Sequence, residues 1–362
     1  MSKAAPSVTL ATAGYDRQIR FWSPSNGTCR HHIMFAESVR KRKRRIYLFC
    51  MLTCFYVSGV FRICSVCMSK FFSHISSCLF SLHAACPSLQ QINRLAISPQ
   101  KNIIAAAGNP LAKLFDINTS SATFTCEGHT GNVTAVGFQR LGKWLYTASE
   151  DAHIKIWDPR VRGSRRSSTN SSPINDVVLH PNQAEIISVC RDGSVQVWDL
   201  VANRIKKSIP AVSEGEDSSL QTVSVMADAS LLVAASNSGH VHVWDIANDY
   251  KFVRSFQAHR GYILKCQFSP DLRCLATTSS DSTVKLWSTK DHKFDCIQTL
   301  ASHSKWVWDC AFSADSSYLL TSSSDCSAKL WELQRGIVIR NFTPHNKAVV
   351  AVALNDTDKV KE

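Results

Sequence analysis

The chain has 362 residues, of which 44% are hydrophobic, so it is long enough for one large domain or two ordinary ones. Its formal net charge is +13, but residues 39–90 hold eight basic residues and no acidic one, and the other 310 residues carry only +5. That balance gives no support for a nucleic-acid partner. Six of the fourteen cysteines lie in the same segment and the others lack pairing motifs, which excludes a disulfide framework and favours a reducing compartment.

A strand-like phrase that ends in an aromatic residue recurs seven times, beginning with "RQIRFW" and "LAKLFD" and continuing through "HIKIWD" to "SAKLWE". The last five intervals between the aromatic residues are 42, 41, 46, 43 and 44 residues, which is the period of a WD-repeat propeller blade. The first interval is 93 residues, and it becomes 41 when residues 39–90 are left out. The pattern therefore predicts an all-β, seven-bladed WD-repeat β-propeller that spans 1–362 as one domain, with an irregular insert at 39–90. The aromatic residues are Trp22, Phe115, Trp157, Trp198, Trp244, Trp287 and Trp331.

The two ends of the chain predict how the ring closes. The N-terminal stretch "VTLATAGYDRQIRFW" has the pattern of a second and third strand with no first strand before it, and no signal-peptide core precedes it. The C-terminal stretch "HNKAVVAVALND" has the pattern of a first strand with nothing after it. We expect His345 to join Asp16 and Trp22, so that one blade is built from both ends and no sheet edge is left open around the circle.

The insert begins with six consecutive basic residues, 40–45, followed by sixteen uncharged residues, 46–61. We hypothesise that residues 39–90 are the translation of a retained intron. Val39-Arg40 can be encoded by GTAAGA, which carries a splice-donor sequence, and Gln90 by CAG, which ends like an acceptor after residues with pyrimidine-rich codons. The alternatives are a genuine disordered insert, a nuclear-localisation signal in the basic run, and a membrane anchor. Sixteen residues fall short of the roughly 20 that span a bilayer, so no integral membrane segment is expected.

Three repeats share a fixed spacing in which Asp follows His by 22 residues and Trp follows Asp by 6. A buried His ring can donate a hydrogen bond to the turn Asp and accept one from a strand Ser or Thr whose neighbour bonds the Trp indole N–H. A His, an Asp and a Ser also suggest a hydrolase triad, but recurrence at the blade period favours a structural network. Its members are His129, Asp151, Trp157, His259, Asp281, Trp287, His303, Asp325 and Trp331.

The polar stretch "RGSRRSSTNSS" at 162–172 occupies the place of a fourth strand. We expect that strand to be frayed. Its basic and serine-rich character is typical of a solvated loop, with a phosphorylation target as the alternative.

The phrases "LATAGYDRQIRFW", "LHPNQAE" and "WVWDCAFS" closely resemble one WD-repeat family, the small propeller subunit of target-of-rapamycin kinase complexes, also called G protein β-subunit-like protein. The likeness extends over all seven blades. It implies a non-enzymatic scaffold without cofactors that binds and stabilises the kinase domain in the cytoplasm, or peripherally on lysosomal or other endomembranes through the kinase complex. The residue patterns also favour a non-enzymatic protein, since the sequence has no phosphate-cradling glycine loop, nucleophile elbow or metal-ligand cluster.

A partner-binding face is predicted on the rim formed by the starts of the innermost strands and the residues before each turn Asp. Two tryptophans lie two positions apart on one strand there and point the same way, and aromatic and Arg side chains anchor protein interfaces. The alternative is that both tryptophans belong to the core. The predicted binding residues are Tyr15, Gln91, Asn93, Asn132, Glu150, Asn175, Arg191, Tyr262, Trp306 and Trp308.

Three other functions compete with the kinase scaffold. The first is a WD-repeat adaptor of another assembly, such as a ubiquitin-ligase substrate receptor. The second is a membrane-anchored signalling protein that uses the apolar part of the insert. The third is a propeller enzyme, which requires charged catalytic groups that converge in the channel, and the sequence offers none outside the repeat pattern.

Overall fold

The computed structural model describes residues 8–35, 91–100, 102–161, 163–210, 219–343 and 345–356. Residues 8–34 and the described residues from 91 onward form one compact unit. The insert predicted at 39–90 lies outside the described residues, and so does the apolar run at 46–61. Within the described ranges no helix combines the length and the apolar character that a bilayer crossing requires.

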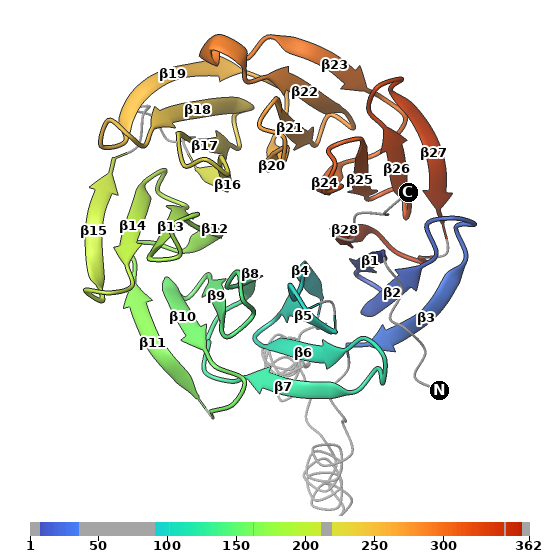
Figure 1. The fold of residues 1–362 in the computed structure, drawn as a ribbon, viewed down its shortest axis with the longest axis horizontal. Helices are drawn as coiled ribbons and strands as arrows, with labels where there is room; N and C mark the ends of the chain where they lie inside the picture. Colours follow the sequence, from blue (N-terminus) through green and yellow to red (C-terminus); the bar gives the residue numbers. More distant parts are fainter. Residues whose placement is uncertain are drawn as a thin grey trace, which may run out of the picture. The chain divides into compact units, whose positions relative to one another are not determined.

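Seven four-stranded antiparallel sheets stand around a central axis, as Figure 1 shows, which confirms the predicted seven-bladed propeller. Blade 1 consists of β28 (Val349–Asn355), β1 (Thr9–Gly14), β2 (Gln18–Trp22) and β3 (Cys29–Met34), from the inside outward. Blade 2 consists of β4 (Ile92–Ile97), β5 (Ile103–Gly108), β6 (Ala112–Asp116) and β7 (Ala122–Cys126). Blade 3 consists of β8 (Val133–Phe138), β9 (Leu145–Ser149), β10 (His153–Trp157) and β11 (Ser164–Thr169).

The remaining four blades repeat this order from the channel to the outside. Blade 4 consists of β12 (Ile174–Leu179), β13 (Glu185–Cys190), β14 (Val195–Asp199) and β15 (Arg204–Ile209), and blade 5 of β16 (Leu220–Val225), β17 (Leu231–Ser236), β18 (His240–Asp245) and β19 (Lys251–Gln257). Blade 6 consists of β20 (Ile263–Phe268), β21 (Cys274–Ser279), β22 (Val284–Ser288) and β23 (Cys296–Leu300), with a short 3-10 turn, η1 (Lys290–His292), before β23. Blade 7 consists of β24 (Val307–Phe312), β25 (Tyr318–Ser323), β26 (Ala328–Glu332) and β27 (Ile337–Phe342).

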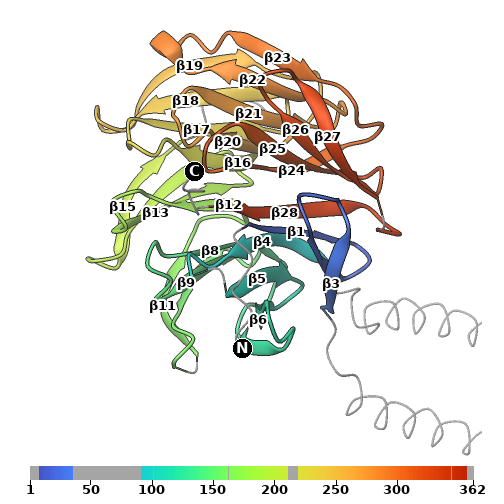
Figure 2. The same cartoon turned by 45° about the vertical axis from the view of Figure 1, so that its right-hand side comes forward.

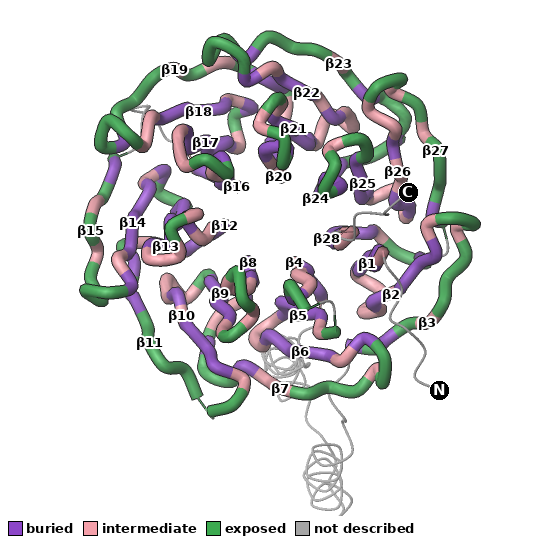
Figure 3. Tube along the Cα trace, in the orientation of Figure 1, coloured by how far each residue is buried: buried purple, intermediate pink, exposed green. Residues whose placement is uncertain are grey.

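The second strand of each blade forms the core between neighbouring blades. Every residue of β1, β13 and β17 is buried, and apart from Glu185 at the start of β13 these strands consist of small and branched apolar residues with Ser or Thr. A strand covered on both faces needs no polar alternation, which explains the continuous apolar runs in the sequence. The fourth strands are mostly exposed, so Figure 3 shows an exposed outer circle around buried inner strands.

The fourth strand of blade 3 is well formed, so the prediction of a frayed strand was wrong. β11 pairs antiparallel with β10, with Ile154 opposite Ser168 and Lys155 opposite Ser167. An outermost strand needs a partner on one side only, and charged side chains on such an edge are tolerated because they point into water. The first four residues of β11, Ser164 to Ser167, are exposed in succession, and Ser168 is the one buried residue of this strand.

The ring closes by pairing the two ends of the chain, as predicted. β28 runs antiparallel to β1, with Thr9 opposite Asn355 and Ala13 opposite Ala351. The oblique view in Figure 2 shows these two strands side by side in one sheet. Two segments from opposite ends of the chain therefore supply the inner half of blade 1.

The His, Asp and Trp network is present in the three blades in which the spacing predicts it. In blade 6, His259 Nδ1 lies 2.9 Å from the Asp281 carboxylate, and His259 Nε2 lies 2.8 Å from the hydroxyl of Thr277. The Trp287 indole N–H donates to the same Thr277 hydroxyl at 2.9 Å, so one threonine serves both rings where we expected two neighbouring residues. The sets of His129 and His303 have the same connections, with Thr147 and Thr321.

The network keeps its aspartates ionised. Burial alone would raise the pKa of Asp151, but hydrogen bonds from the Thr130 N–H and from His129 outweigh it and lower the pKa to about 2. For Asp281 burial acts in the same direction, and His259 and Thr283 outweigh it, so the pKa again falls below its ordinary value. These residues hold turns and strands together inside their blades, which fits the structural interpretation and not a hydrolase triad.

Candidate functional site: an aromatic rim and a charged channel

Four aromatic side chains form a continuous row on one rim of the propeller. The ring centroids of Tyr262 and Trp306 are 6.2 Å apart, those of Trp306 and Trp308 are 5.7 Å apart, and those of Trp308 and Tyr15 are 6.4 Å apart. The row crosses from the start of β20 over the start of β24 to the β1–β2 turn, and thus joins blades 6, 7 and 1. We call these four residues the aromatic row.

The two tryptophans differ in how they are held. Trp306 is 42% exposed and Tyr262 is 48% exposed, which are large values for aromatic side chains. Trp308 is half-buried, and its indole N–H donates to the Ser324 hydroxyl at 2.6 Å. Trp308 therefore fixes the position of the row against blade 7, whereas Trp306 and Tyr262 remain largely exposed to solvent. Neither tryptophan takes the buried position of the repeat, which Trp331 fills.

The other predicted binding residues lie on the same rim but do not form one cluster. The backbone N–H of Glu150 bonds the carbonyl of Asn132 at 2.9 Å, and that of Arg191 bonds Pro173 at 2.9 Å, so both turns lie beside first-strand starts. Glu150 and Arg191 are exposed, and Gln91 is half-buried at the entry to β4. The predicted binding residues on this rim therefore come from blades 2, 3 and 4 as well as from the aromatic row on blades 6, 7 and 1.

Two of the predicted asparagines use their amides between blades. Asn93 donates to the carbonyl of Val133 at 2.8 Å and to Asn132 Oδ1 at 2.6 Å, which connects blade 2 to blade 3. Asn175 donates to the carbonyl of Leu220 at 2.6 Å, which connects blade 4 to blade 5. Their roles in partner binding stay predictions, and their positions show an additional structural role.

Sequence reasoning missed three exposed cations beside the aromatic row. Arg260 precedes Tyr262 by two residues, Lys305 is adjacent to Trp306, and Lys347 lies in the loop whose Ala348 carbonyl accepts the Tyr15 N–H at 3.0 Å. The nearby turn aspartates Asp281, Asp325 and Asp16 are occupied by histidines inside the blades. The rim around the row is therefore aromatic and basic.

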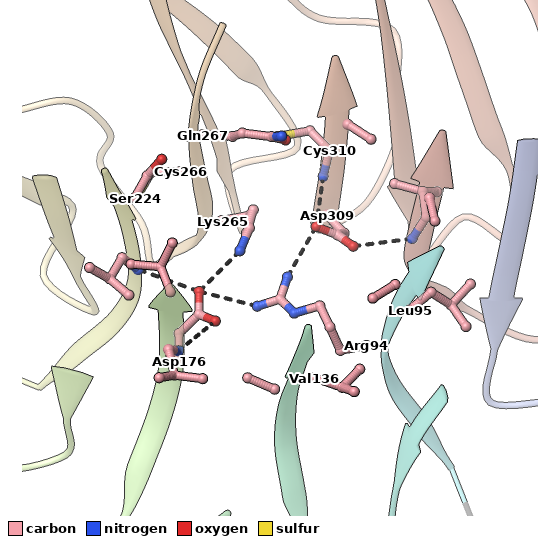
Figure 4. Close-up of a pocket in the computed structure, with 18 of the residues that line it drawn as sticks. Arg94, Leu95, Val136, Asp176, Ser224, Lys265, Cys266, Gln267, Asp309 and Cys310 are labelled. Atoms are coloured by element: carbon pink, nitrogen blue, oxygen red, sulfur yellow. Dashed lines mark hydrogen bonds and ion pairs between the residues drawn. The ribbon is translucent and has the colours of Figure 1, made fainter. Parts of the chain in front are cut away.

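The central channel contains a second arrangement that the sequence did not reveal. Its cavity of about 410 Å³ is lined by the first strands of all seven blades. Figure 4 shows the Arg94 guanidinium between two carboxylates, Asp176 at 3.3 Å and Asp309 at 3.1 Å. Lys265 approaches Asp176 from the other side at 3.0 Å. We call Arg94, Asp176, Lys265 and Asp309 the channel ion cluster.

The channel ion cluster corrects the expectation that no charged groups converge in the channel. Four do, because each occupies the third position of a first strand in a different blade, and that position points inward. The sequence of a single blade shows no sign of this cluster, because its ion-pair partners lie 82 to 215 residues apart and come from different blades.

The charges in the channel cancel in pairs. Burial would raise the pKa of Asp176, and Lys265, Arg94 and a 2.8 Å hydrogen bond from Thr222 outweigh it and lower the pKa. Asp309 Oδ2 accepts the backbone N–H of Val352 at 3.1 Å. A general acid or base needs a pKa near neutrality, and the cluster holds Asp176 on the ionised side. In the ranges that the structure describes, no three His, Cys, Asp or Glu side chains converge as a metal site would require.

The fold and the repeated network together define a WD-type β-propeller. Its exposed aromatic row is a surface of the kind that protein interaction modules use. A family model described as the first β-propeller of IFT122 matches residues 91–360.

Several curated proteins are similar to the chain over nearly its full length. The target of rapamycin complex subunit wat1 of Schizosaccharomyces pombe is 44% identical over 357 residues, which cover 97% of this chain and 96% of the relative. The target of rapamycin complex subunit LST8 of Saccharomyces cerevisiae is 38% identical over 359 residues, with 97% and 99% covered. The LST8 homologue of Dictyostelium discoideum is 41% identical over 291 residues, with 79% and 78% covered. The chain belongs to the LST8 family of WD-type β-propellers, which confirms the resemblance found in its repeats.

Proposed function

We propose that the protein is a non-catalytic scaffold subunit of a target of rapamycin complex, and that it binds and stabilises the kinase domain through the aromatic row. The observation that carries this proposal is the row itself, four contacting aromatic rings on the rim of a fold whose relatives are named as subunits of that complex. Interfaces are enriched in aromatic side chains at their centres, where burial on binding excludes water.

The character of the rim specifies the partner surface. Trp306 and Tyr262 provide a wide apolar area at little cost in side-chain entropy, because each has few rotatable bonds and Trp308 fixes the row in place. Arg260, Lys305 and Lys347 surround it with positive charge. A kinase-domain segment that complements this rim carries apolar side chains within an acidic border, and charge attraction speeds the encounter of the two proteins.

The protein acts in the cytoplasm under this proposal, with peripheral recruitment to lysosomal or other endomembranes through the kinase complex. The eight cysteines of the described residues are all free, and four of them are buried inside blades. Free thiols of this kind are typical of proteins in reducing compartments.

The test is co-purification of the full chain with the target of rapamycin kinase of the same organism. We expect Trp306→Ala combined with Trp308→Ala to abolish recovery of the kinase, because each interface anchor contributes roughly 2 kcal/mol or more. The matched control is Phe252→Ala on β19, since Phe252 is 42% exposed, as is Trp306, but lies on the outer strand of blade 5. Circular dichroism at 20 °C verifies that all variants are folded.

The two possible failures are distinguishable. If the folded double variant recovers the kinase as well as the wild type does, the aromatic row is not the binding site. If the wild-type protein itself recovers no kinase but does recover a ubiquitin-ligase scaffold, the kinase-complex function is wrong and the adaptor alternative replaces it.

A further inference from the structure

The rim opposite the aromatic row contains a recess between blades 3 and 4. Its volume is about 380 Å³, and it is lined by Trp144, Ile156, Leu200 and Val201 together with Arg165 and Arg166. Trp144 and Val201 belong to the β8–β9 and β14–β15 turns, at the ends where first strands finish, whereas the aromatic row lies where they start. We call these six residues the basic recess. A partner in it leaves the aromatic row accessible.

The surroundings of the basic recess expose apolar side chains that the fold does not need. Val201 is 81% exposed, Leu141 on the β8–β9 turn is 59% exposed, and Val161 on the β10–β11 turn is 45% exposed. A single exposed apolar side chain is ordinary on a protein surface, but three on turns at the same end of two neighbouring blades, one of them lining a hollow that contains a tryptophan, are typical of an interaction site.

The electrostatics of the basic recess favour a negatively charged occupant. The charged side chains among its lining residues are both arginines. Two carboxylates lie nearby. Asp158 is shared between Arg160 at 2.8 Å and Arg165 at 3.3 Å while its side chain is only 1% exposed. Asp199 accepts the backbone N–H of Val201 at 2.7 Å. Arg166 donates to the backbone carbonyl of Leu200, which is uncharged. The positive charge around the recess therefore exceeds the negative charge that balances it.

The two arginines are held in place before any partner arrives. Arg165 is anchored by Asp158, and Arg166 by Leu200, and both are carried by β11, whose pairing with β10 fixes their spacing. Guanidinium groups fixed in this way lose little side-chain entropy when they form bidentate hydrogen bonds with a carboxylate. The polar stretch that was expected to be a frayed strand is thus a paired strand that presents arginines.

We propose that the basic recess binds an acidic peptide segment of a partner protein that inserts one apolar side chain beside Trp144. The carboxylates of the segment pair with Arg165 and Arg166, and the apolar side chain fills the hollow next to Ile156 and Leu200. A recess of this size admits a single side chain, which favours a peptide over an anionic membrane, because a flat bilayer surface cannot enter it. This proposal is independent of kinase binding at the aromatic row.

The experiment measures the binding of a fluorescein-labelled peptide to the full chain by fluorescence anisotropy. The probe has one leucine flanked on both sides by glutamates, and two control peptides replace the leucine by serine or the glutamates by lysines. We expect saturable binding of the probe that weakens as salt is added, and about tenfold weaker binding of each control peptide.

Two variants and one matched control locate the site. We expect Val201→Asp and Arg165→Ala each to weaken binding of the probe about tenfold. Arg165→Ala leaves Asp158 paired with Arg160, and Val201 is exposed, so both variants should fold. Ile297→Asp is the control, because Ile297 is 61% exposed on β23 of blade 6, far around the ring, and it should bind the probe normally.

Two results would overturn the proposal. The first is the absence of saturable binding, or binding that neither Val201→Asp nor Arg165→Ala weakens. The second is failure to bind the peptide together with binding to phosphatidylserine vesicles that both variants lose, which would make this surface a membrane contact. Kinase recovery by Val201→Asp should equal that of the wild type, so failure at this site is separable from failure at the aromatic row.

Discussion

The Nδ1 atom of His345 lies 2.8 Å from the carboxylate of Asp16, although 329 residues separate the two along the chain. The same ring contacts the Thr12 hydroxyl at 2.7 Å through Nε2, and Thr12 accepts the Trp22 indole N–H at 2.8 Å. Blade 1 thus contains the same network as blades 3, 6 and 7, but here the network bridges the two ends of the chain. It reinforces the pairing of β1 with β28, which closes the ring by hydrogen bonds between the two ends of the chain.

Asp16→Ala should therefore have a larger structural effect than the same change within a continuous blade. Loss of a buried hydrogen-bond partner costs about 1–3 kcal/mol of unfolding free energy, both for Asp16→Ala and for Asp281→Ala, which leaves His259 without its partner. Only Asp16→Ala should also accelerate amide hydrogen exchange in β28 and β1, because the ring opens there. Urea denaturation and exchange monitored by mass spectrometry measure both quantities. Equal exchange of β28 in the two variants would contradict this view of the joint.

Removal of Arg94 should destabilise the ring from the inside. Arg94→Met leaves Asp309 without its ion-pair partner in the channel, where the Asp309 side chain is only 4% exposed. Breaking a buried ion pair on one side typically costs about 3–5 kcal/mol, because the remaining charge stays desolvated. Combining Arg94→Met with Asp309→Asn should restore part of that free energy, since the amide is neutral. Chemical denaturation of the single and double variants tests this, and an additive pair of effects would show that the two residues are not coupled.

The two tryptophans of the aromatic row should differ in their contribution to stability. Trp308→Ala removes a half-buried ring and the 2.6 Å hydrogen bond to Ser324, so it should lower the unfolding free energy by about 1–3 kcal/mol. Trp306→Ala truncates an exposed side chain and should change it by no more than about 0.5 kcal/mol. Thermal denaturation of the two single variants measures the difference, and a reversed order would refute the assignment of Trp308 as the support of the row.

His242 should make the protein sensitive to mild acid. Burial lowers the pKa of His242 to about 4, with a smaller contribution from the nearby His240. The unfolded chain has a histidine pKa of about 6.5, so between these values the unfolded state binds a proton that the folded state does not. The unfolding free energy therefore falls as the pH decreases from about 6.5 to 4, by up to about 3 kcal/mol from this residue. Aspartates with lowered pKa values add their loss only below about pH 4.

The variant His242→Phe isolates this contribution. Its unfolding free energy should fall less between pH 7 and pH 5 than that of the wild type, because the titrating ring is gone while an aromatic side chain still fills the site. Urea denaturation at the two pH values provides the comparison. Identical pH dependence in both proteins would assign the acid sensitivity to other groups, such as His129, whose pKa burial also lowers.

The hypothesis that residues 39–90 derive from a retained intron predicts a shorter transcript. The described flanks agree with an interruption between blades, because β3 ends at Met34 and β4 begins at Ile92, where the fourth strand of blade 1 passes to the first strand of blade 2. Sequencing of transcripts across the codons for Ser38 and Gln91 should find a major product that joins them directly. If every transcript retains the intervening codons, the segment is a genuine insert and the intron hypothesis is wrong.

The architecture could be predicted from the sequence, because a propeller repeats one local unit. The spacing of Trp157, Trp198, Trp244, Trp287 and Trp331 gave the period, and the incomplete units at the two ends gave the closure through His345 and Asp16. Each His, Asp and Trp set was predictable because its members lie within 28 residues of one another in one blade or across the joint that the period implies. The tryptophans of the rim could be recognised because they lie outside the positions that the repeat assigns to tryptophan.

The interactions between different blades became apparent only in the folded ring. Arg94, Asp176, Lys265 and Asp309 read as ordinary strand residues, and they become one cluster because the ring directs their side chains to a common axis. The basic recess likewise combines turns of two blades with a strand whose composition is that of a loop. That strand is ordered because β10 offers it a complete edge of backbone hydrogen-bonding groups, and this pairing outweighs the weak strand propensity of Arg and Ser. Contacts between units depend on distances that the sequence of a single unit does not contain.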